Sequence, residues 1–115
     1  MYIGEKLIDR PFRWGIVGGG KTSQVGYKHR LGAMRDNTSF VLTAAAFDVD
    51  AERCKEFGRN LCMDEDRCYP DYKTMFEAEA KREDGIEVVD VATPNFLHYE
   101  VTKAALEAGP HGICE

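Results

Sequence analysis

A glycine-rich stretch near the start of the chain, GIVGGGKTS over residues 15–23, satisfies two different signatures for binding phosphate groups. Read from Gly15, it is G-x-x-x-x-G-K-[ST], the P-loop in which backbone amides and a lysine hold a nucleoside triphosphate. Read from Gly18, it is G-x-G-x-x-S, close to the dinucleotide-binding pattern G-x-G-x-x-G/A. The first pattern indicates phosphoryl transfer, and the second indicates a redox cofactor.

The strand that must precede the glycines favours the dinucleotide pattern. A P-loop begins after its strand has ended, which would place Ile16 and Val17, the most strand-like residues here, inside the loop. The strand would then consist of RPFRW. This segment contains Pro11 and two arginines, which are unfavourable in a central strand. In the dinucleotide pattern, Ile16 and Val17 instead end the strand.

Each position of the loop then has a physical role. Gly18 makes the tight turn, and Gly20 allows the backbone to approach a pyrophosphate above the helix N-terminus, where the helix dipole favours an anion. Ser23 takes the third position, where a small residue permits close packing of helix and strand. Lys21 stands at the helix start, where it can contact a phosphate. A P-loop, a site for S-adenosylmethionine and a plain connecting turn remain the alternatives.

A carboxylate follows the second buried-type run. Residues 40–47, FVLTAAAF, are continuously apolar, as in a strand covered on both faces, and Asp48 comes directly after them. Dinucleotide folds place an acidic residue here to bind the ribose hydroxyls of the adenosine. Asp48 also favours NAD over NADP because it would repel a 2′-phosphate, although Arg53 is close to it in the sequence. A P-loop protein could use the same carboxylate for magnesium, so Asp48 alone does not decide.

A third candidate loop follows the apolar run IEVVDVAT at residues 86–93. Thr93, Pro94 and Asn95 place a rigid turn and an amide side chain at the carboxyl edge of the sheet. Open α/β folds bind their ligands at this edge. The simpler alternative is a proline turn in which Asn95 caps the next helix.

These loops require alternating strands and helices, which the hydrophobic pattern predicts. We expect strands at 12–17, 40–47, 86–93 and 111–115, a further edge strand near Cys68 and Tyr69, and helices that start at Thr22 or Ser23, Asp50, Asp71 and Asn95. Tyr27, Leu31 and Met34 are expected on the buried face of the first helix. Alternating elements with short joints predict an α/β fold, a right-handed, doubly wound parallel sheet.

The bulk composition limits the function classes. With 115 residues the chain is one domain, which we place at 12–115 after an N-terminal arm at 1–11. A net charge of -5 argues against nucleic acid as a partner. The chain has neither a membrane-spanning run nor a signal peptide, so a cytoplasmic location is expected. Its four cysteines show no ligand-like spacing, and no metal site is predicted.

Taken together, the three glycines, Asp48 and the segment ATPN-x-x-H at 92–98 resemble the cofactor domain of the Gfo/Idh/MocA family of oxidoreductases. The resemblance runs from about Phe12 to Glu115. It implies a Rossmann fold that binds NAD, with NADP less expected, in an enzyme that moves a hydride between a sugar or polyol hydroxyl and the nicotinamide.

The resemblance also implies a role for each matching residue. By resemblance, Gly18, Gly20, Thr22 and Ser23 approach the pyrophosphate, Asp48 binds the adenosine ribose, Thr93, Pro94 and Asn95 line the nicotinamide side, Glu115 lies near the nicotinamide ribose, and His98 either joins this site or only packs and caps.

The chain departs from the family pattern at its end. The sequence stops at Glu115, one residue before the lysine that the family uses for proton transfer, and the family's substrate domain would follow that lysine. We therefore assign no catalytic residue and expect this chain alone to be catalytically incompetent. Gly112 would weaken the last strand, whose exposed edge favours self-association into a homo-oligomer. A non-catalytic dinucleotide-binding module is the main alternative function.

Overall fold

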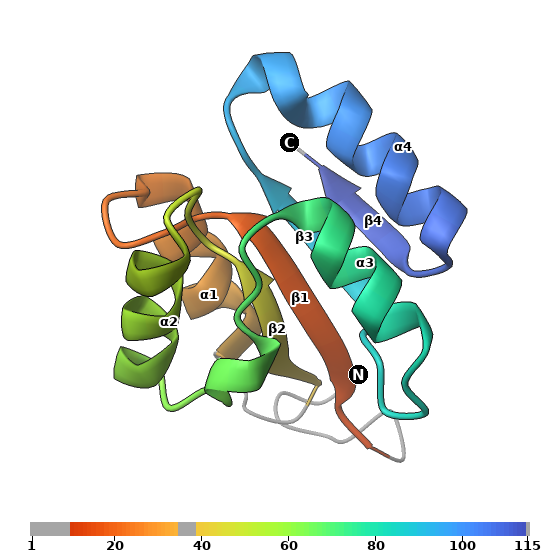
Figure 1. Cartoon of the computed structure of the whole chain (residues 1–115), viewed down its shortest axis with the longest axis horizontal. Helices are drawn as coiled ribbons and strands as arrows, with labels where there is room; N and C mark the ends of the chain where they lie inside the picture. Colours follow the sequence, from red (N-terminus) through yellow and green to blue (C-terminus); the bar gives the residue numbers. More distant parts are fainter. Residues whose placement is uncertain (1–9, 35–38, 115) are drawn as a thin grey trace, which may run out of the picture.

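In the computed structural model, four strands of the described residues, 10–34 and 39–114, form one parallel sheet in the order β2-β1-β3-β4 (Figure 1). The strands are β1 Phe12–Gly18, β2 Phe40–Ala46, β3 Val88–Ala92 and β4 His111–Cys114. The helices are α1 Gln24–Met34, α2 Ala51–Asn60, α3 Tyr72–Ala80 and α4 His98–Ala108, with short 3-10 turns η1 Glu65–Arg67 and η2 Asn95–Leu97. This alternation confirms the predicted doubly wound α/β fold. Glu115 and most of the predicted arm, residues 1–9, lie outside the described residues.

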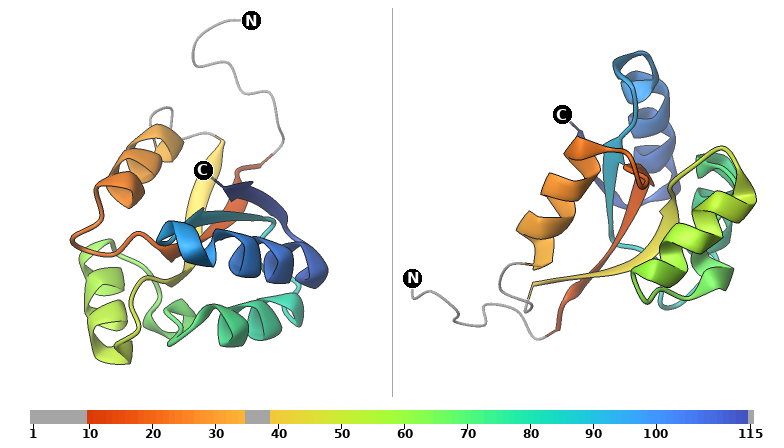
Figure 2. Two further views of the ribbon diagram at one scale, coloured as in Figure 1. Left: turned by 90° about the horizontal axis from the view of Figure 1, so that it is seen from above. Right: turned by 90° about the vertical axis from the view of Figure 1, so that its left-hand side faces the viewer.

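Helices cover both faces of the sheet. On one face α3 and α4 pack against the strands in a single buried cluster, which includes Val17, Ala44, Met75, Phe76, Val89, Val91, Val101 and Ala105. α1 lies on the opposite face (Figure 2), and α2 packs beside β2, with Cys54 against Phe47. Apart from Asp90 on β3, the buried side chains of the central strands are apolar, because parallel strands between helix layers have no solvent-facing side. Ile16 and Val89 are accordingly fully buried.

The first helix turns a different face to the sheet from the one that its apolar residues predict. Tyr27, Leu31 and Met34 are 54–58% exposed, whereas Gly26 and Arg30 are the buried residues of α1. The helical spacing is as predicted, but its phase is shifted by one residue. The reason is steric, because Gly26 lets the α1 backbone come against the glycine loop.

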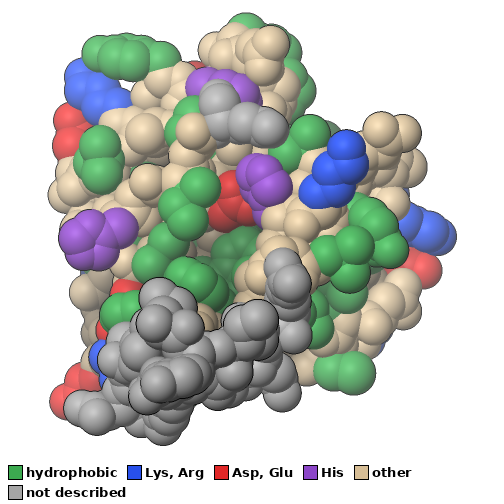
Figure 3. Space-filling model, turned by 180° about the vertical axis from the view of Figure 1, so that it is seen from behind, with side chains coloured by type: hydrophobic (Ala, Val, Ile, Leu, Met, Phe, Trp, Pro, Cys, Tyr) green, Lys and Arg blue, Asp and Glu red, His purple; other side chains and the backbone are tan. Residues whose placement is uncertain are grey.

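A hydrogen-bonded pair also ties α1 to the middle of the sheet. His29 Nδ1 on α1 lies 2.7 Å from Oδ2 of Asp90, whose side chain is buried on β3. Seen from behind, this face is hollowed between hydrophobic side chains (Figure 3), and the cavity of about 320 Å³ includes Trp14, Val88 and Ile113 in its lining.

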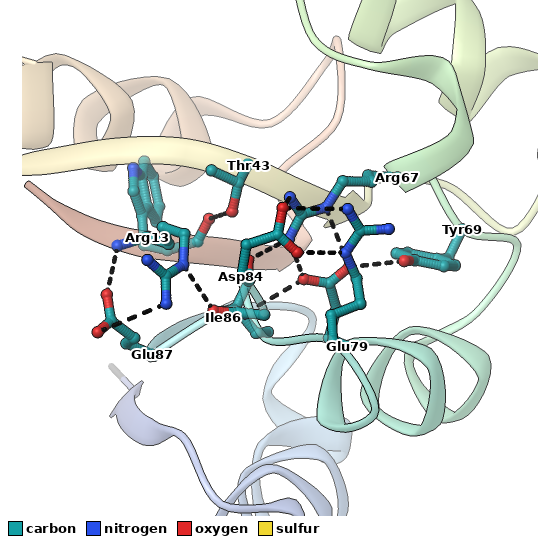
Figure 4. A network of polar contacts seen from close by, with 11 residues as sticks. Arg13, Thr43, Arg67, Tyr69, Glu79, Asp84, Ile86 and Glu87 are labelled. Atoms are coloured by element: carbon teal, nitrogen blue, oxygen red, sulfur yellow. Dashed lines mark hydrogen bonds and ion pairs between the residues drawn. The ribbon is translucent and has the colours of Figure 1, made fainter.

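A buried ion pair anchors α3 to the segment that follows α2. Glu79 on α3 is 3% exposed and accepts hydrogen bonds from Nε and Nη2 of Arg67, a buried residue of η1. The Tyr69 hydroxyl donates to Glu79 Oε2 at 2.6 Å, and the Ile86 amide donates to Oε1 at 3.2 Å (Figure 4). Burial, together with the hydrogen bond to Glu79, raises the pKa of Tyr69 to about 12. Each Glu79 oxygen therefore has a partner, as a buried carboxylate requires.

A second carboxylate joins the start of β1 to the segment before β3. Glu87 Oε2 accepts hydrogen bonds from Arg10 Nη1 at 2.8 Å and from the Arg13 amide at 2.9 Å. These contacts, led by the hydrogen bond from Arg10, lower the pKa of Glu87 to about 2.

The Glu79 network predicts a large loss of stability when the carboxylate is removed. Glu79→Ala removes the buried counter-ion of Arg67 and leaves only the exposed Asp84 carboxylate, 3.5 Å from Nη1, so we expect the free energy of unfolding to fall by about 3 kcal/mol. Glu77→Ala, at an exposed position of the same helix, is the matched control and should change stability by less than about 0.5 kcal/mol. Urea unfolding of both variants measures the difference, and equal values would contradict the account.

Glu87 predicts a pH dependence on the acid side. Its pKa is about 2 in the fold against an ordinary 4.5, so the stabilisation is complete above pH 4.5 and is lost as the pH falls toward 2. Glu87→Gln should flatten the stability curve across this window relative to the native chain. Unfolding free energies measured at a series of pH values test this, and parallel curves for the two proteins would argue against it.

Candidate functional site

The carboxyl ends of β1, β2 and β3 meet at one edge of the sheet, which brings the three predicted loops together. Gly18 is paired with Ala92, and Val17 with Ala46. Two cavities of about 530 and 410 Å³ lie at this edge. The first is lined by Gly18, Ser23, Thr93, Pro94, Asn95 and His98, among others, and the second by Gly20, Lys21, Thr22 and Asp48, among others. All the sequence-predicted site residues within the described part of the chain therefore line these two cavities.

A larger cavity, of about 730 Å³, lies at the opposite edge of the sheet. Phe12, Glu83 and Gly109 are among its lining residues, and it contains none of the sequence-predicted site residues. Its larger volume alone would favour it as the ligand site. In open parallel sheets, however, ligands bind at the carboxyl ends of the strands, so we assign the candidate site to the two smaller cavities.

The glycine loop has a backbone that residues with side chains rarely adopt. Gly18 has φ +78° and Gly19 has φ +67°, and both values lie in the left-handed region. A Cβ at Gly18 would lie 2.7 Å from the Ala92 carbonyl oxygen, and one at Gly20 would lie 3.0 Å from the Phe47 carbonyl oxygen. The loop is thus held between the ends of β3 and β2, and no side chain fits between it and either strand.

Gly26 makes the closest approach of α1 to this loop. A Cβ added there would lie 2.4 Å from Gly19 Cα and 2.7 Å from the Gly19 carbonyl oxygen. Ser23, which the glycine pattern assigns to close packing, acts differently, because its hydroxyl accepts a hydrogen bond from the Gly26 amide at 3.0 Å and caps the helix. Gly26, three residues after Ser23, instead allows the close packing of α1 on the loop.

Arg30 is a site residue that the sequence did not reveal. Its side chain is buried, and Nη1 donates a 2.6 Å hydrogen bond to the Gly19 carbonyl oxygen. The guanidinium also lies over the Phe57 ring, 5.0 Å from its centroid, and burial lowers the pKa of Arg30. An arginine in a helix otherwise signals a solvent-facing position, so only the geometry identifies it as the support of the loop.

Asp48 lies beyond the end of β2 and points toward α2. Arg53 forms a two-pronged ion pair with it, Nε to Oδ2 at 3.1 Å and Nη2 to Oδ1 at 2.9 Å, and the Asp50 amide donates to Oδ1 at 3.0 Å. The hydrogen bond from Arg53 is the main reason that the pKa of Asp48 is lowered. The carboxylate is therefore ionised at neutral pH.

The turn after β3 is held by a histidine. His98 Nε2 lies 2.8 Å from the Thr93 carbonyl oxygen, within hydrogen-bond distance, so His98 fixes the turn that contains Pro94. The alternative prediction that Asn95 caps the last helix is wrong. Asn95 instead begins η2, and within the described chain neither η2 nor α4 has a side-chain cap.

Thr93 supplies a polar atom that the described residues do not satisfy. Its Oγ1 is buried and has no hydrogen-bond partner among them, and Thr93 lines the cavity that also contains Gly18. Buried hydroxyls normally have partners. A ligand that occupies this cavity and offers a polar atom would give this hydroxyl a partner.

The P-loop alternative does not agree with the strand pairing. Ile16 pairs with Ala45 and Asp90, and Val17 pairs with Ala46 and Val91, so both lie in a central strand. A P-loop would need them in the loop. Among residues 10–34 and 39–114, moreover, no group of histidine, cysteine and acidic side chains is arranged to hold a metal ion, and no helix is long and apolar enough to cross a membrane.

Comparison with known proteins agrees with the geometry. The model of an oxidoreductase family with an NAD-binding Rossmann fold, Gfo/Idh/MocA, matches residues 12–115. An uncharacterized oxidoreductase of Bacillus subtilis, YfiI, is 68% identical over all of this chain and 29% of its own length. The crystal structure of an inositol dehydrogenase homologue from Azotobacter vinelandii, complexed with NAD+, is 57% identical with a TM-score of 0.94, and the match covers 99% of this chain and 29% of that one. The chain thus spans 29% of the length of these relatives.

The contact between Gly26 and Gly19 predicts a position-specific cost. Gly26→Ala forces the backbone of α1 away from the loop, and we expect a loss of about 1–3 kcal/mol in the free energy of unfolding. Gly32→Ala is the control on the same helix, because a Cβ added there would have no described atom within 4 Å apart from its chain neighbours and the backbone of α1 itself. That variant should gain about 0.5–1 kcal/mol through higher helix propensity. Urea unfolding compares them, and a similar change in both would show that the contact is not tight.

Proposed function

This chain belongs to the Gfo/Idh/MocA family of oxidoreductases, and on that basis we propose that it holds the nicotinamide cofactor of an enzyme that oxidises a sugar or polyol hydroxyl. Binding of NAD is the function of the family's Rossmann domain, which the match covers. The substrate class and the activity of a complete enzyme are our proposals, since the chain spans only 29% of its relatives.

The unsatisfied Thr93 hydroxyl is the observation that carries the proposal. It lies in the cavity shared by the glycine loop and the turn after β3, where the nicotinamide half of a dinucleotide would lie. Bound NAD supplies a carbon that accepts a hydride. This chain would orient that group, with the Thr93 hydroxyl and the Asn95 amide as the polar contacts and His98 holding the turn from behind.

The other half of the site suits the phosphates and the adenosine. The left-handed turn at Gly18 and Gly19 brings the backbone to the N-terminus of α1 without side chains in the way. The dipole of α1 favours an anion there. Thr22, Lys21 and Asp48 line the neighbouring cavity, and there Asp48 would accept hydrogen bonds from the ribose hydroxyls.

The names of the relatives support a sugar or polyol as substrate. The Azotobacter vinelandii homologue has also been crystallised with NADH and myo-inositol, and that structure is 58% identical to this chain. A 30-residue segment is 67% identical to a levoglucosan dehydrogenase of Pseudarthrobacter phenanthrenivorans. In the complete enzyme, a lysine after Glu115 would assist proton transfer from the substrate hydroxyl. The role of Glu115 beside the nicotinamide ribose belongs to the same proposal.

Assembly and location complete the proposal. β4 forms one edge of the sheet, and its residues are exposed. An edge of this kind can pair with another chain or with further strands of a longer protein, and a homo-oligomer belongs to the same proposal. A cytoplasmic location also belongs to the same proposal.

Thr93 provides a test in which binding and stability are separated. Thr93→Val removes the hydroxyl and keeps the shape, so we expect NADH affinity to fall by about tenfold, the value of one hydrogen bond. Stability should be unchanged or slightly higher, because a buried unsatisfied group is lost. Thr102→Val is the matched control: its Oγ1 is also buried without a partner in the described structure, but it lies on α4 outside both cavities.

Calorimetric titration with NADH, NADPH and magnesium ATP gives the readout. We expect the native chain to bind NADH, with the affinity reduced in Thr93→Val and unchanged in Thr102→Val. Equal NADH affinity in the two variants would contradict the role of Thr93. A preference for magnesium ATP would contradict the proposed function itself.

A further inference from the structure

Arg53 is hydrogen-bonded to the Asp48 carboxylate, which a dinucleotide cofactor would need for its adenosine ribose. Its fork contacts both Asp48 oxygens, at 3.1 and 2.9 Å. The Arg53 side chain is 65% exposed, and that of Asp48 is 31% exposed, so the pair lies at the open side of the cavity between the glycine loop and α2. Both residues line this cavity, where the adenosine ribose would lie.

The hydrogen-bonding capacity of Asp48 is almost used up in this arrangement. A carboxylate offers about four lone-pair sites. Arg53 takes one on each oxygen, and the Asp50 amide takes a second on Oδ1. The ribose of NAD presents two hydroxyl donors on neighbouring carbons, and these cannot both be accepted while Arg53 stays in place. Tight NAD binding therefore requires Arg53 to rotate away, which an exposed ion pair resists only weakly.

The charges around the cavity also permit a 2′-phosphate to bind. Its charged lining residues are Lys21, Arg53, Asp48 and Glu56, so the positive and negative charges balance. A lone Asp48 would repel the 2′-phosphate of NADP. Here a guanidinium lies beside it, and its planar fork matches a phosphate as well as a carboxylate. A 2′-phosphate can thus take the place of Asp48 as the partner of Arg53.

We propose that Arg53 sets the choice between NAD and NADP, because it competes with the ribose hydroxyls for Asp48 and offers its guanidinium to a 2′-phosphate. The site then binds NAD and also accepts NADP. This inference rests on the proposed function, since it concerns the same cofactor. It assigns a specificity-determining role to a residue of α2 outside the glycine loop.

Paired titrations of the 115-residue chain with NADH and NADPH test the inference. Arg53→Ala and Arg53→Met both remove the fork, and Met keeps much of the aliphatic stem. In both, we expect the ratio Kd(NADPH)/Kd(NADH) to rise by about tenfold or more, because a charged hydrogen-bond donor to phosphate is lost and Asp48 is freed for the ribose.

Arg59→Ala is the matched control. Arg59 is on the same helix and pairs with Glu65 on the surface, and it does not line the cavity. The variant removes the same charge, so the Kd ratio should stay within about twofold of the native value because exposed charges are well screened. An unchanged ratio in both Arg53 variants, or an equal shift in Arg59→Ala, would overturn the inference. A native chain that binds NADH but not NADPH would also overturn it, whereas failure to bind either nucleotide would refute the proposed function as well.

Discussion

The close contact of two backbones, at Gly19 and Gly26, is the constraint on which the site depends. Because Gly26 has no side chain, α1 packs directly on the loop that follows β1, and this fixes the distance between the helix N-terminus and the edge of the sheet. Arg30 holds the same loop through the Gly19 carbonyl. The contact sets the phase of α1, so its larger apolar side chains face outward. A helix packed through Tyr27, Leu31 and Met34 would stand further off and could not present its N-terminus to a pyrophosphate at the strand ends.

The site combines a rigid part with an adjustable one. The glycine loop and the turn after β3 are fixed by backbone contacts and by buried or half-buried side chains, Arg30 and His98. Asp48 and Arg53, by contrast, are held by an exposed ion pair that can rearrange at little cost. This division suits a dinucleotide, whose pyrophosphate and nicotinamide must be placed accurately for hydride transfer. The adenosine end mainly contributes affinity and the choice of cofactor.

The sequence predicted the elements well because buried parallel strands are apolar runs, as in the buried residues 44–47, and because Asp50 and Asp71 act as helix caps through their side chains. It also placed Gly18, Asp48 and Thr93 at one edge, since parallel strands end together. It did not predict the buried face of α1, because a glycine and an arginine carry no apolar signal. The support from Arg30 and the unsatisfied Thr93 hydroxyl depend on distances between segments far apart in the chain, which no local pattern encodes.

The proposed cofactor site joins the glycine loop to the turn after β3. The most direct measurement is the change in backbone amide NMR signals of the isotope-labelled chain as NADH is added. We expect the shifts to concentrate at residues 18–23, at Asp48 and at residues 93–98, around the two cavities at the carboxyl edge of the sheet. Shifts centred instead on Phe12, Glu83 and Gly109, around the larger cavity at the opposite edge, would contradict it.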